Sequence, residues 1–253
     1  MAERKIVFFL VEGKSDMSAL ERIFDVIYDK YEIEFKILHG DITADERIPI
    51  KDIEQLLLKQ VDLYLQNHEE IEVTDILKVI QIIDTDGAFI PPEKVKQSSD
   101  GKTSYTDEYI FAKNRERLIA RNIRKREIVY KLRKSQYMEA RVEGTFYKMD
   151  YQVYFMSRNL EHALYGYEGD YTDEEKEDFA FEFTESFVDR EGEFIKYLNH
   201  SDIMIEGDYQ ETWNYIFTGI NSLHRGSNLH LIFKDIMLEL DKSEYECKRK
   251  ENQ

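Results

Sequence analysis

The chain of 253 residues is 42% hydrophobic and 13% aromatic, which supplies a folded core and excludes a wholly disordered protein. Its length suits one large domain, or a core domain with a smaller appendage. The net charge of −17 argues against indiscriminate nucleic-acid binding, because the field of the whole molecule repels phosphate.

Three buried strands separated by two helices are predicted in the first ninety residues. Lys5 to Val11 is a run of β-branched and aromatic residues, typical of a strand buried on both faces. Ser15 or Asp16 is expected to cap a helix whose apolar residues recur every three or four positions from Met17 to Tyr31. A strand at 35–38, a helix at about 51–66 and a strand at 77–83 complete a βαβ alternation, which predicts a parallel sheet.

The rest of the chain divides into an insertion, one more strand and a helical end. Pro91 and Pro92 end the regular structure, and Tyr151 to Met156 is predicted to return to the sheet. From about residue 172 the apolar spacing indicates helices, including 209–220 and 229–240. The predicted division is an α/β core at 1–90 plus 148–166, a basic helical insertion at 91–147 and a C-terminal helical region at 167–253.

Apolar runs and cysteine content indicate the cellular compartment of the protein. No apolar run approaches the ~20 residues of a membrane span, and the first apolar run reaches Glu12 too soon for a secretory signal. Cys247 is the one cysteine, so the chain forms no internal disulfide. We therefore expect a cytoplasmic protein that does not associate with membranes.

Carboxylates follow two of the predicted strands. Glu12 ends the first strand, and Asp84 and Asp86 follow the third. Loops at the carboxyl ends of parallel strands converge on a ligand-binding crevice, and acids brought together there repel one another unless a cation is present. Oxygen ligands of this kind suit Mg²⁺ or Mn²⁺, and Gly87 allows the backbone to turn sharply beside them.

These residues also carry a family resemblance. The segment from Val11 through Glu12 to Asp16 (VEGKSD), followed by a buried strand ending in Asp84-Thr85-Asp86-Gly87, resembles the TOPRIM domain. That domain is shared by topoisomerases, DnaG-type primases, small maturation ribonucleases and OLD-type nucleases. The helix directly after Glu12 is most similar to the OLD-type, antiphage-defence branch. The resemblance covers about residues 5–90 and 148–165.

The resemblance implies a set of site residues. A further acid after the last strand is expected in this branch, and Glu161 matches it. The implied metal ligands are Glu12, Asp16, Asp84, Asp86 and Glu161, binding Mg²⁺ or Mn²⁺, and the implied catalytic residues are Glu12, Lys14, Asp84, Asp86 and Glu161. Ordinary structural roles stay open for three groups: Asp16 as a helix N-cap, Glu161 as an acid favoured at a helix start, and Lys14 and Arg158 as exposed cations.

Charge is unevenly distributed along the chain. Residues 113–134 carry ten Lys or Arg against two Glu, and residues 168–193 carry twelve acids against two basic residues. The basic stretch is either a docking face for a nucleic-acid backbone or a solvated helix neutralised by the acidic segment. The residues predicted to bind nucleic acid are Arg121, Arg124, Lys125, Arg126, Lys131, Arg133, Lys134 and Arg158.

The leading hypothesis is a Mg²⁺-dependent endonuclease that cleaves DNA or RNA, tRNA included. The resemblance implies the toxic effector of a bacterial antiphage system that acts by abortive infection. The resemblance also implies an ATPase partner, which would be a separate protein because the chain has no P-loop of its own, and a homodimer is an open alternative to a monomer.

Two other functions stay open. The string Asp84-Thr85-Asp86-Gly87 also resembles the start of haloacid-dehalogenase-type phosphatases, in which Asp84 would be the nucleophile and Glu12 would have no assigned role. The third hypothesis is a TOPRIM-like sensor or partner subunit without catalysis, for which the acidic segment 168–193 would be the docking surface.

Overall fold

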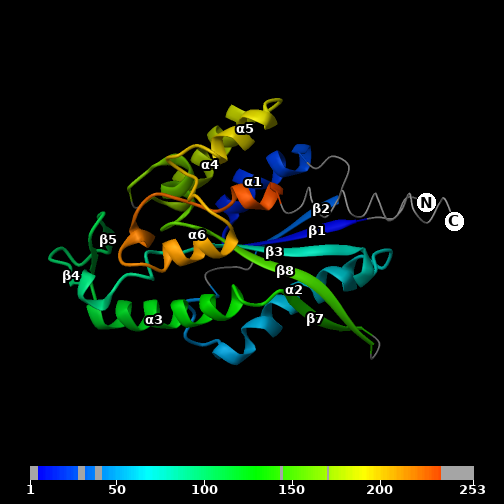
Figure 1. Cartoon of the computed structure of the whole chain (residues 1–253), viewed down its shortest axis with the longest axis horizontal. Coiled ribbons are helices and arrows are strands. Elements are labelled where there is room, and N and C mark those ends of the chain that lie inside the picture. The colour runs from blue at the N-terminus through cyan, green and yellow to red at the C-terminus, as the bar shows by residue number, and fades with distance from the viewer. Residues whose placement is uncertain (1–4, 28–31, 38–41, 143–144, 170, 235–253) are drawn as a thin grey trace.

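A mainly parallel five-stranded sheet forms the centre of the protein (Figure 1). The computed structural model describes residues 5–27, 32–37, 42–142, 145–169 and 171–234. The strand order is β2-β1-β3-β8-β7, in which the first four strands are parallel and β7 is an antiparallel edge. The strands span Ile6–Val11 (β1), Glu32–Ile37 (β2), Ile76–Asp84 (β3), Tyr137–Val142 (β7) and Thr145–Met156 (β8).

Helices cover both faces of this sheet. Successive side chains of a strand point to opposite faces, so Phe8 of β1 packs in one core and Phe9 in the other. In Figure 1, α1, α4 and α5 lie on one side of the sheet and α2 and α3 on the other, and α6 packs into the same core as α2. The helices span Lys14–Ile27 (α1), Ile53–Asn67 (α2), Arg115–Leu132 (α3), Asp173–Phe187 (α4), Glu191–Leu198 (α5) and Tyr209–Ile216 (α6).

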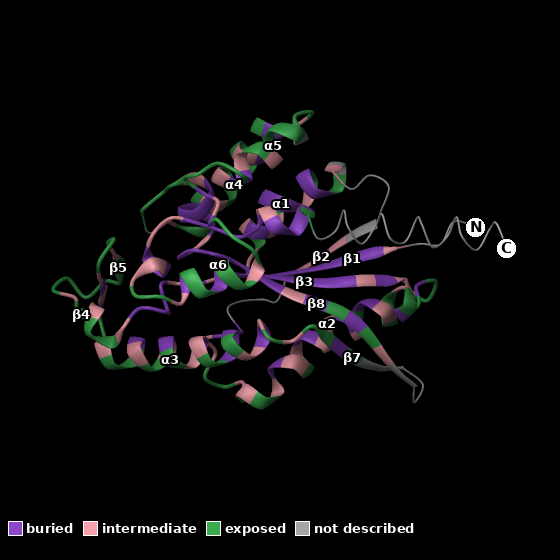
Figure 2. Ribbon diagram, in the orientation of Figure 1, coloured by how far each residue is buried: buried purple, intermediate pink, exposed green. Residues whose placement is uncertain are grey.

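Burial follows this three-layer arrangement. The central strands β1 and β3 are buried along most of their length and β8 is buried over residues 153–156, whereas the outer helices alternate buried and exposed residues (Figure 2). Burial of a strand on both faces is what a continuous apolar run favours. Short helical turns join the main elements: η1 (Ile50–Asp52), η2 (Val73–Asp75), η3 (Pro92–Lys94), the π-helical η4 (Glu161–Tyr165) and η5 (Asn221–Leu223).

The sequence predicted a helical insertion at 91–147, but this segment also contains strands. Before α3 it forms a second sheet in the order β4-β6-β5, from strands Val95–Gln97 (β4), Ser104–Tyr105 (β5) and Ile110–Ala112 (β6). Leu118 of α3 and Leu223 pack with these strands in a separate small core. The end of the insertion supplies β7, which belongs to the main sheet.

The predicted α/β class is confirmed, with a parallel-rich sheet flanked by helices. Strands β1, β2 and β3 and the two helices between β1 and β3 lie close to the predicted ranges, whereas β8 begins at Thr145, before the strand predicted from Tyr151 to Met156. Tyr31, residue 38 and residues 235–240 of the last predicted helix lie outside the described residues. Within the described residues, no helix combines the length and the apolar character needed to cross a bilayer.

The aromatic cluster around Phe24 of α1 gives a test of this packing. Its buried ring contacts the rings of Phe9, Phe35, Phe194 and Phe233, at centroid distances of 5.1, 5.7, 6.1 and 5.3 Å. Phe24→Ala should lower the free energy of unfolding by about 3–5 kcal/mol, because it leaves a cavity between α1, the sheet and α5. Urea unfolding followed by the fluorescence of the one tryptophan, Trp213, measures the loss.

Phe181 of α4 is the matched control, since its side chain is 65% exposed. Phe181→Ala should change the unfolding free energy by less than about 0.5 kcal/mol. Equal losses for the two variants would contradict the packing of α1 on the sheet.

Candidate active site at the carboxyl edge of the sheet

Three neighbouring strands end at one edge of the sheet, and their loops are joined by backbone hydrogen bonds. Thr85 N–H after β3 donates to Met156 O of β8 at 2.9 Å, and Asp86 N–H donates to Arg158 O at 2.8 Å. In return, Arg158 N–H donates to Thr85 Oγ1 at 2.9 Å. The loops after β3 and β8 are therefore fixed against each other, with Glu12 at the end of the adjacent strand β1.

Backbone conformation at this edge is unusual. Asp86 and Arg158 both have positive φ, 48° and 53°, a region that residues other than glycine seldom adopt. Gly87 follows with φ of 62°, and a Cβ atom there would lie 2.7 Å from Leu223 Cδ2. Glycine is therefore required at position 87 for two reasons, the turn and the close approach of Leu223. Backbone strain of this kind clusters at functional sites.

Asp84 lies among the other acids at the carboxyl edge of the sheet, and their charges act on its carboxyl group. Burial raises the pKa of its carboxyl well above the ordinary value, and the negative charges of Asp16, Glu12 and Asp86 raise it further. Its Oδ1 atom is shielded from solvent and has no hydrogen-bond donor among the described residues. The predicted acids at the ends of β1 and β3 thus lie close enough to repel one another strongly.

Asp16 belongs to the same cluster, and it is not the helix N-cap, which was one of the two roles left open for it by the sequence. Helix α1 begins at Lys14, so Asp16 lies in its first turn, and its Oδ2 accepts the Gly13 N–H at 2.9 Å. This is the backward reach of an acid at the third helical position. Burial raises the pKa of Asp16 to about 6, and repulsion from Glu161 adds to the rise.

Glu161, the acid predicted across the insertion, is brought to this cluster. It begins the π-helical turn η4 that follows β8, and it is buried. Single π-helical turns occur frequently at functional sites. Lys176 of α4 lies 3.8 Å from Glu161 Oε1, so a helix of the C-terminal region supplies a cation to this end of the cluster.

Lys125 requires a correction. It was predicted to lie on an exposed face that binds nucleic acid, but its side chain is 0% exposed and its Nζ lies 2.6 Å from Asp86 Oδ2. Its positive charge opposes the rise in the pKa of Asp84. The lysine is therefore an internal counter-ion of the acidic cluster rather than a contact for an external phosphate.

The other predicted basic residues of α3 also make contacts within the protein. Arg124 donates to Ile48 O, and Arg126 donates to Ile90 O at 3.0 Å. Lys131 pairs with Glu54 at 3.3 Å, and Arg133 and Lys134 lie over the ring of Tyr130. The contacts of Arg124, Arg126 and Lys131 fix α3 to the rest of the protein, whereas Arg133 and Lys134 follow α3 and pack on a ring of that helix. None of them tests whether nucleic acid binds, so that role stays a prediction.

Besides Lys125, the predicted cations Arg158 and Arg121 also lie beside Asp86. The buried Arg158 guanidinium donates from Nε to Leu223 O at 2.8 Å and from Nη2 to Asp107 Oδ1 at 3.3 Å. Arg121 Nη2 donates to Asp86 O at 3.3 Å. Lys14, predicted to be catalytic, lies exposed at the start of α1.

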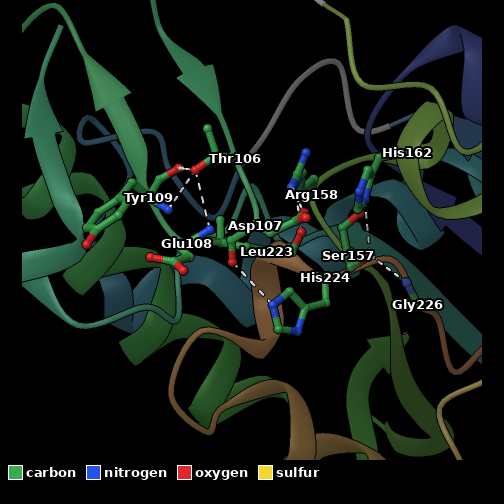
Figure 3. A network of polar contacts seen from close by, with 10 residues as sticks. All are labelled: Thr106, Asp107, Glu108, Tyr109, Ser157, Arg158, His162, Leu223, His224 and Gly226. Atoms are coloured by element: carbon green, nitrogen blue, oxygen red, sulfur yellow. Dashed lines mark hydrogen bonds and ion pairs between the residues drawn. The ribbon is translucent and has the colours of Figure 1, made fainter.

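Figure 3 shows how Arg158 is held between the insertion and the C-terminal region. Asp107 of the β5–β6 loop accepts from Arg158, and its backbone oxygen lies 3.2 Å from His224 Nε2. On the other side, Ser157 Oγ accepts the Gly226 N–H at 2.8 Å and lies 3.4 Å from His162 Nδ1. Burial, reinforced by the charge of Arg158, lowers the pKa of His162 to about 4, so its ring is neutral at pH 7.

Two clefts open beside the acids. The first, of about 570 Å³, is lined by Asp86, Arg121, Arg158 and His162, together with Tyr105 and Tyr167. The second, of about 820 Å³, runs along the start of α3 past Lys113 and Arg117. Thr103 and Arg121 line both clefts, so the two are neighbours, and the first reaches Asp86.

Several residues of this site were missed in the sequence. Tyr105 and Tyr167 are two of seventeen tyrosines, Asp107 lies in a polar loop, and Lys176 is in an acidic segment. No spacing distinguishes them, because each reaches the site only through the packing of the insertion or of α4. The unusual backbone at Asp86 had one indication in the sequence, the neighbouring Gly87, whereas that at Arg158 had none.

The donor chemistry of the acids fits a hard divalent cation. The repulsion at Asp84 and its shielded oxygen are the features that such an ion would relieve. In the described part of the chain, however, no three acidic, histidine or cysteine side chains already converge as a ready-made metal site. Binding would therefore require side-chain movement.

Comparison of the chain with known protein families, with curated proteins and with solved structures gives no match. The site is therefore interpreted from its own geometry.

The buried charge of Asp16 gives a stability test. With a pKa of about 6 in the folded protein, the ionised carboxylate costs about 3 kcal/mol of folding free energy above pH 6. This cost falls as the pH drops from 6 toward the ordinary value of 3.8, where folded and unfolded chains both bind the proton. Asp16→Asn, which keeps an acceptor for Gly13, should stabilise the metal-free protein by about 3 kcal/mol at pH 8 and by about half as much at pH 5.

Urea denaturation in EDTA at the two pH values measures this difference. Asp178→Asn, at an exposed position on α4, is the control and should stay within about 0.5 kcal/mol of the parent protein. Destabilisation by Asp16→Asn at pH 8 would contradict the repulsion.

Lys125 gives a second test. Lys125→Met leaves the acids without their internal counter-ion, so the metal-free protein should lose about 3 kcal/mol of stability. Addition of Mg²⁺ should restore more stability to this variant than to the parent, because the ion replaces the missing positive charge. Thermal unfolding with and without Mg²⁺ measures both effects.

Lys131→Met removes a cation from the same helix whose partner, Glu54, is partly exposed. It should cost less than about 1 kcal/mol and gain nothing from Mg²⁺. If both lysine variants behave alike, Lys125 is not the counter-ion of the cluster.

Proposed function

We propose that the protein is a metal-dependent nuclease that hydrolyses phosphodiester bonds at the carboxyl edge of its sheet. The observation that carries the proposal is the group of buried, mutually repelling acids around Asp84, drawn from the ends of three neighbouring strands. A protein retains such a costly cluster where a cation and a reaction use it. Cations at the adjacent cleft supply a place for a phosphate.

Mg²⁺ or Mn²⁺ bound there would activate water and neutralise charge on the phosphodiester as it reacts. Glu12, Asp16, Asp84, Asp86 and Glu161 are the residues proposed to hold it. Arg121 and Arg158 orient the phosphate from the side of the cleft, and Lys125 holds Asp86 in place before the metal binds. His162 is neutral at pH 7, so it can accept a proton or a hydrogen bond but adds no charge.

The proposed nuclease family rests on the resemblance of the sequence motifs to the TOPRIM domain. The order of the motifs, with Glu12 after the first strand and Asp84 with Asp86 after a later one, supports a TOPRIM-like nuclease of the OLD-type, antiphage-defence branch. Within this proposal the protein is a cytoplasmic effector that cleaves DNA or RNA and causes abortive infection. A separate ATPase would be its partner, and self-association into a homodimer belongs to the same proposal.

One observation favours a second candidate, a haloacid-dehalogenase-type phosphatase with Asp84 as nucleophile. Such enzymes carry a lysine later in the chain than the Asp-x-Asp motif, and Lys125 reaches Asp86. This candidate leaves Glu12, Asp16 and Glu161 without a role, so the nuclease is preferred. A sensor without catalysis would likewise leave the cost of the buried acids unexplained.

Activity assays separate the three functions. The purified protein is incubated with Mg²⁺ or Mn²⁺ and with plasmid DNA, total tRNA or a phosphomonoester, beside Glu12→Gln and Asp84→Asn. The nuclease should cleave a polynucleotide, and each variant should lower the rate at least ~100-fold, because each removes a proposed metal ligand. Glu182→Gln, at an exposed position on α4 that lines neither cleft, is the matched control and should retain activity.

Phosphomonoester hydrolysis that is lost in Asp84→Asn but kept in Glu12→Gln would replace the nuclease with the phosphatase. Full polynucleotide cleavage by both variants would show that the acids are not its active site. Absence of all activity, with a stable partner protein recovered, would favour the sensor.

A further inference from the structure

The cleft that ends at Asp86 has the lining of a nucleotide subsite. Its twelve lining residues include three cations, Lys102, Arg121 and Arg158, against two acids, Asp86 and Glu168. This local excess of positive charge occurs in a chain whose net charge is −17. Phosphate is therefore attracted to this opening in a protein whose net charge repels it.

Tyr105 organises the cations of the cleft. The Arg158 guanidinium lies 5.7 Å from the centre of its ring, and the Tyr105 hydroxyl interacts with Arg121. Asp107 and Leu223 O fix Arg158 from behind. Two guanidinium groups are thus fixed in the lining of the cleft that reaches Asp86, and guanidinium is a side-chain group that binds phosphate well.

Tyr167 supplies an aromatic surface to the same cleft. Its side chain is 40% exposed, although its ring contacts the rings of Tyr165 and Phe179 at centroid distances of 5.7 and 4.7 Å. A large aromatic ring that stays partly exposed while its edges are supported is a platform on which a nucleobase can stack.

The volume of the cleft limits what can enter it. About 570 Å³ lies in the range of sites that enclose one small organic molecule, ~300–1,000 Å³, which suits a mononucleotide and not a duplex segment. The second cleft continues from Arg121 toward Arg117 and Lys113. A strand whose nucleotide occupied the first cleft would therefore meet further cations along its backbone.

We infer that the first cleft is a subsite for one unpaired nucleotide, so that the substrate is single-stranded nucleic acid. Arg121 and Arg158 bind the phosphate beside Asp86, and Tyr167 stacks on the base. A base within a duplex would first have to leave its stack to reach Tyr167, at a cost of a few kcal/mol. This inference rests on the proposed function for the identity of the ligand and adds to it the strandedness of the substrate.

Binding to labelled oligonucleotides tests the inference with the full chain in EDTA, where no cleavage occurs. The probes are a fluorescein-labelled twelve-nucleotide DNA of mixed sequence, the matching RNA, and the DNA annealed to its complement, and the readout is fluorescence anisotropy. Single strands should bind at least ~10-fold more tightly than the duplex. The comparison of DNA with RNA identifies which sugar the subsite accepts.

Substitutions of Tyr167 test whether its ring stacks on a nucleobase. Tyr167→Ala should weaken single-strand binding by about 5- to 150-fold, the equivalent of ~1–3 kcal/mol for one stacked base. Tyr167→Phe keeps the ring and should stay within about twofold. Tyr215→Ala is the matched control, because Tyr215 is 42% exposed and lines neither cleft, and it should bind as the parent does.

Duplex binding as tight as single-strand binding, or no effect of Tyr167→Ala, would overturn the subsite whatever the cleavage assays give. Selective binding of single strands that depends on the Tyr167 ring would support it, even if Mg²⁺ and Mn²⁺ produced no cleavage. In that second case the proposed nuclease would fail while the nucleotide subsite stood.

Discussion

Mutual repulsion among buried carboxylates is the constraint on which the rest of this structure depends. Burial and neighbouring negative charge both disfavour the ionised form of Asp84, and each further acid increases the cost. The protein offsets this cost with cations from two distant segments, Lys125 of α3 and Lys176 of α4. The insertion and the C-terminal region are therefore tied to the core by the charges of the site as well as by apolar packing.

Much of the fold could be predicted because apolar patterning reports burial directly. The continuous run of β1 identifies a strand covered on both faces, and Phe8 and Phe9 indeed pack in separate cores. The strands of the insertion could not be predicted, because they show no apolar pattern. Its strands β4, β5 and β6 have two or three residues each, too few to show a period, and they are stabilised by a small core that includes Leu223, far away in the sequence.

The acids of the site could be predicted, whereas the roles of the cations could not. Glu12, Asp84 and Asp86 follow strands, and the order of parallel strands brings strand ends together whatever the details of packing. A helix rich in Lys and Arg gives no such information, because charge alone does not say which side chains face inward. Lys125 lies one helical turn from Arg121, yet one is enclosed beside Asp86 and the other lines a cleft.

Asp86 connects the two halves of the site. Its positive φ and its backbone bond to Arg158 place it where the acidic cluster meets the cleft, and Lys125 holds its carboxylate on the inner side. In the proposed nuclease, a divalent cation would share that carboxylate with Lys125, since an ammonium group and a metal ion both bind its oxygens. A phosphate bound by Arg121 and Arg158 would add negative charge beside the cluster and raise the benefit of a bound cation. Substrate and metal are thus expected to favour each other's binding through this one carboxylate.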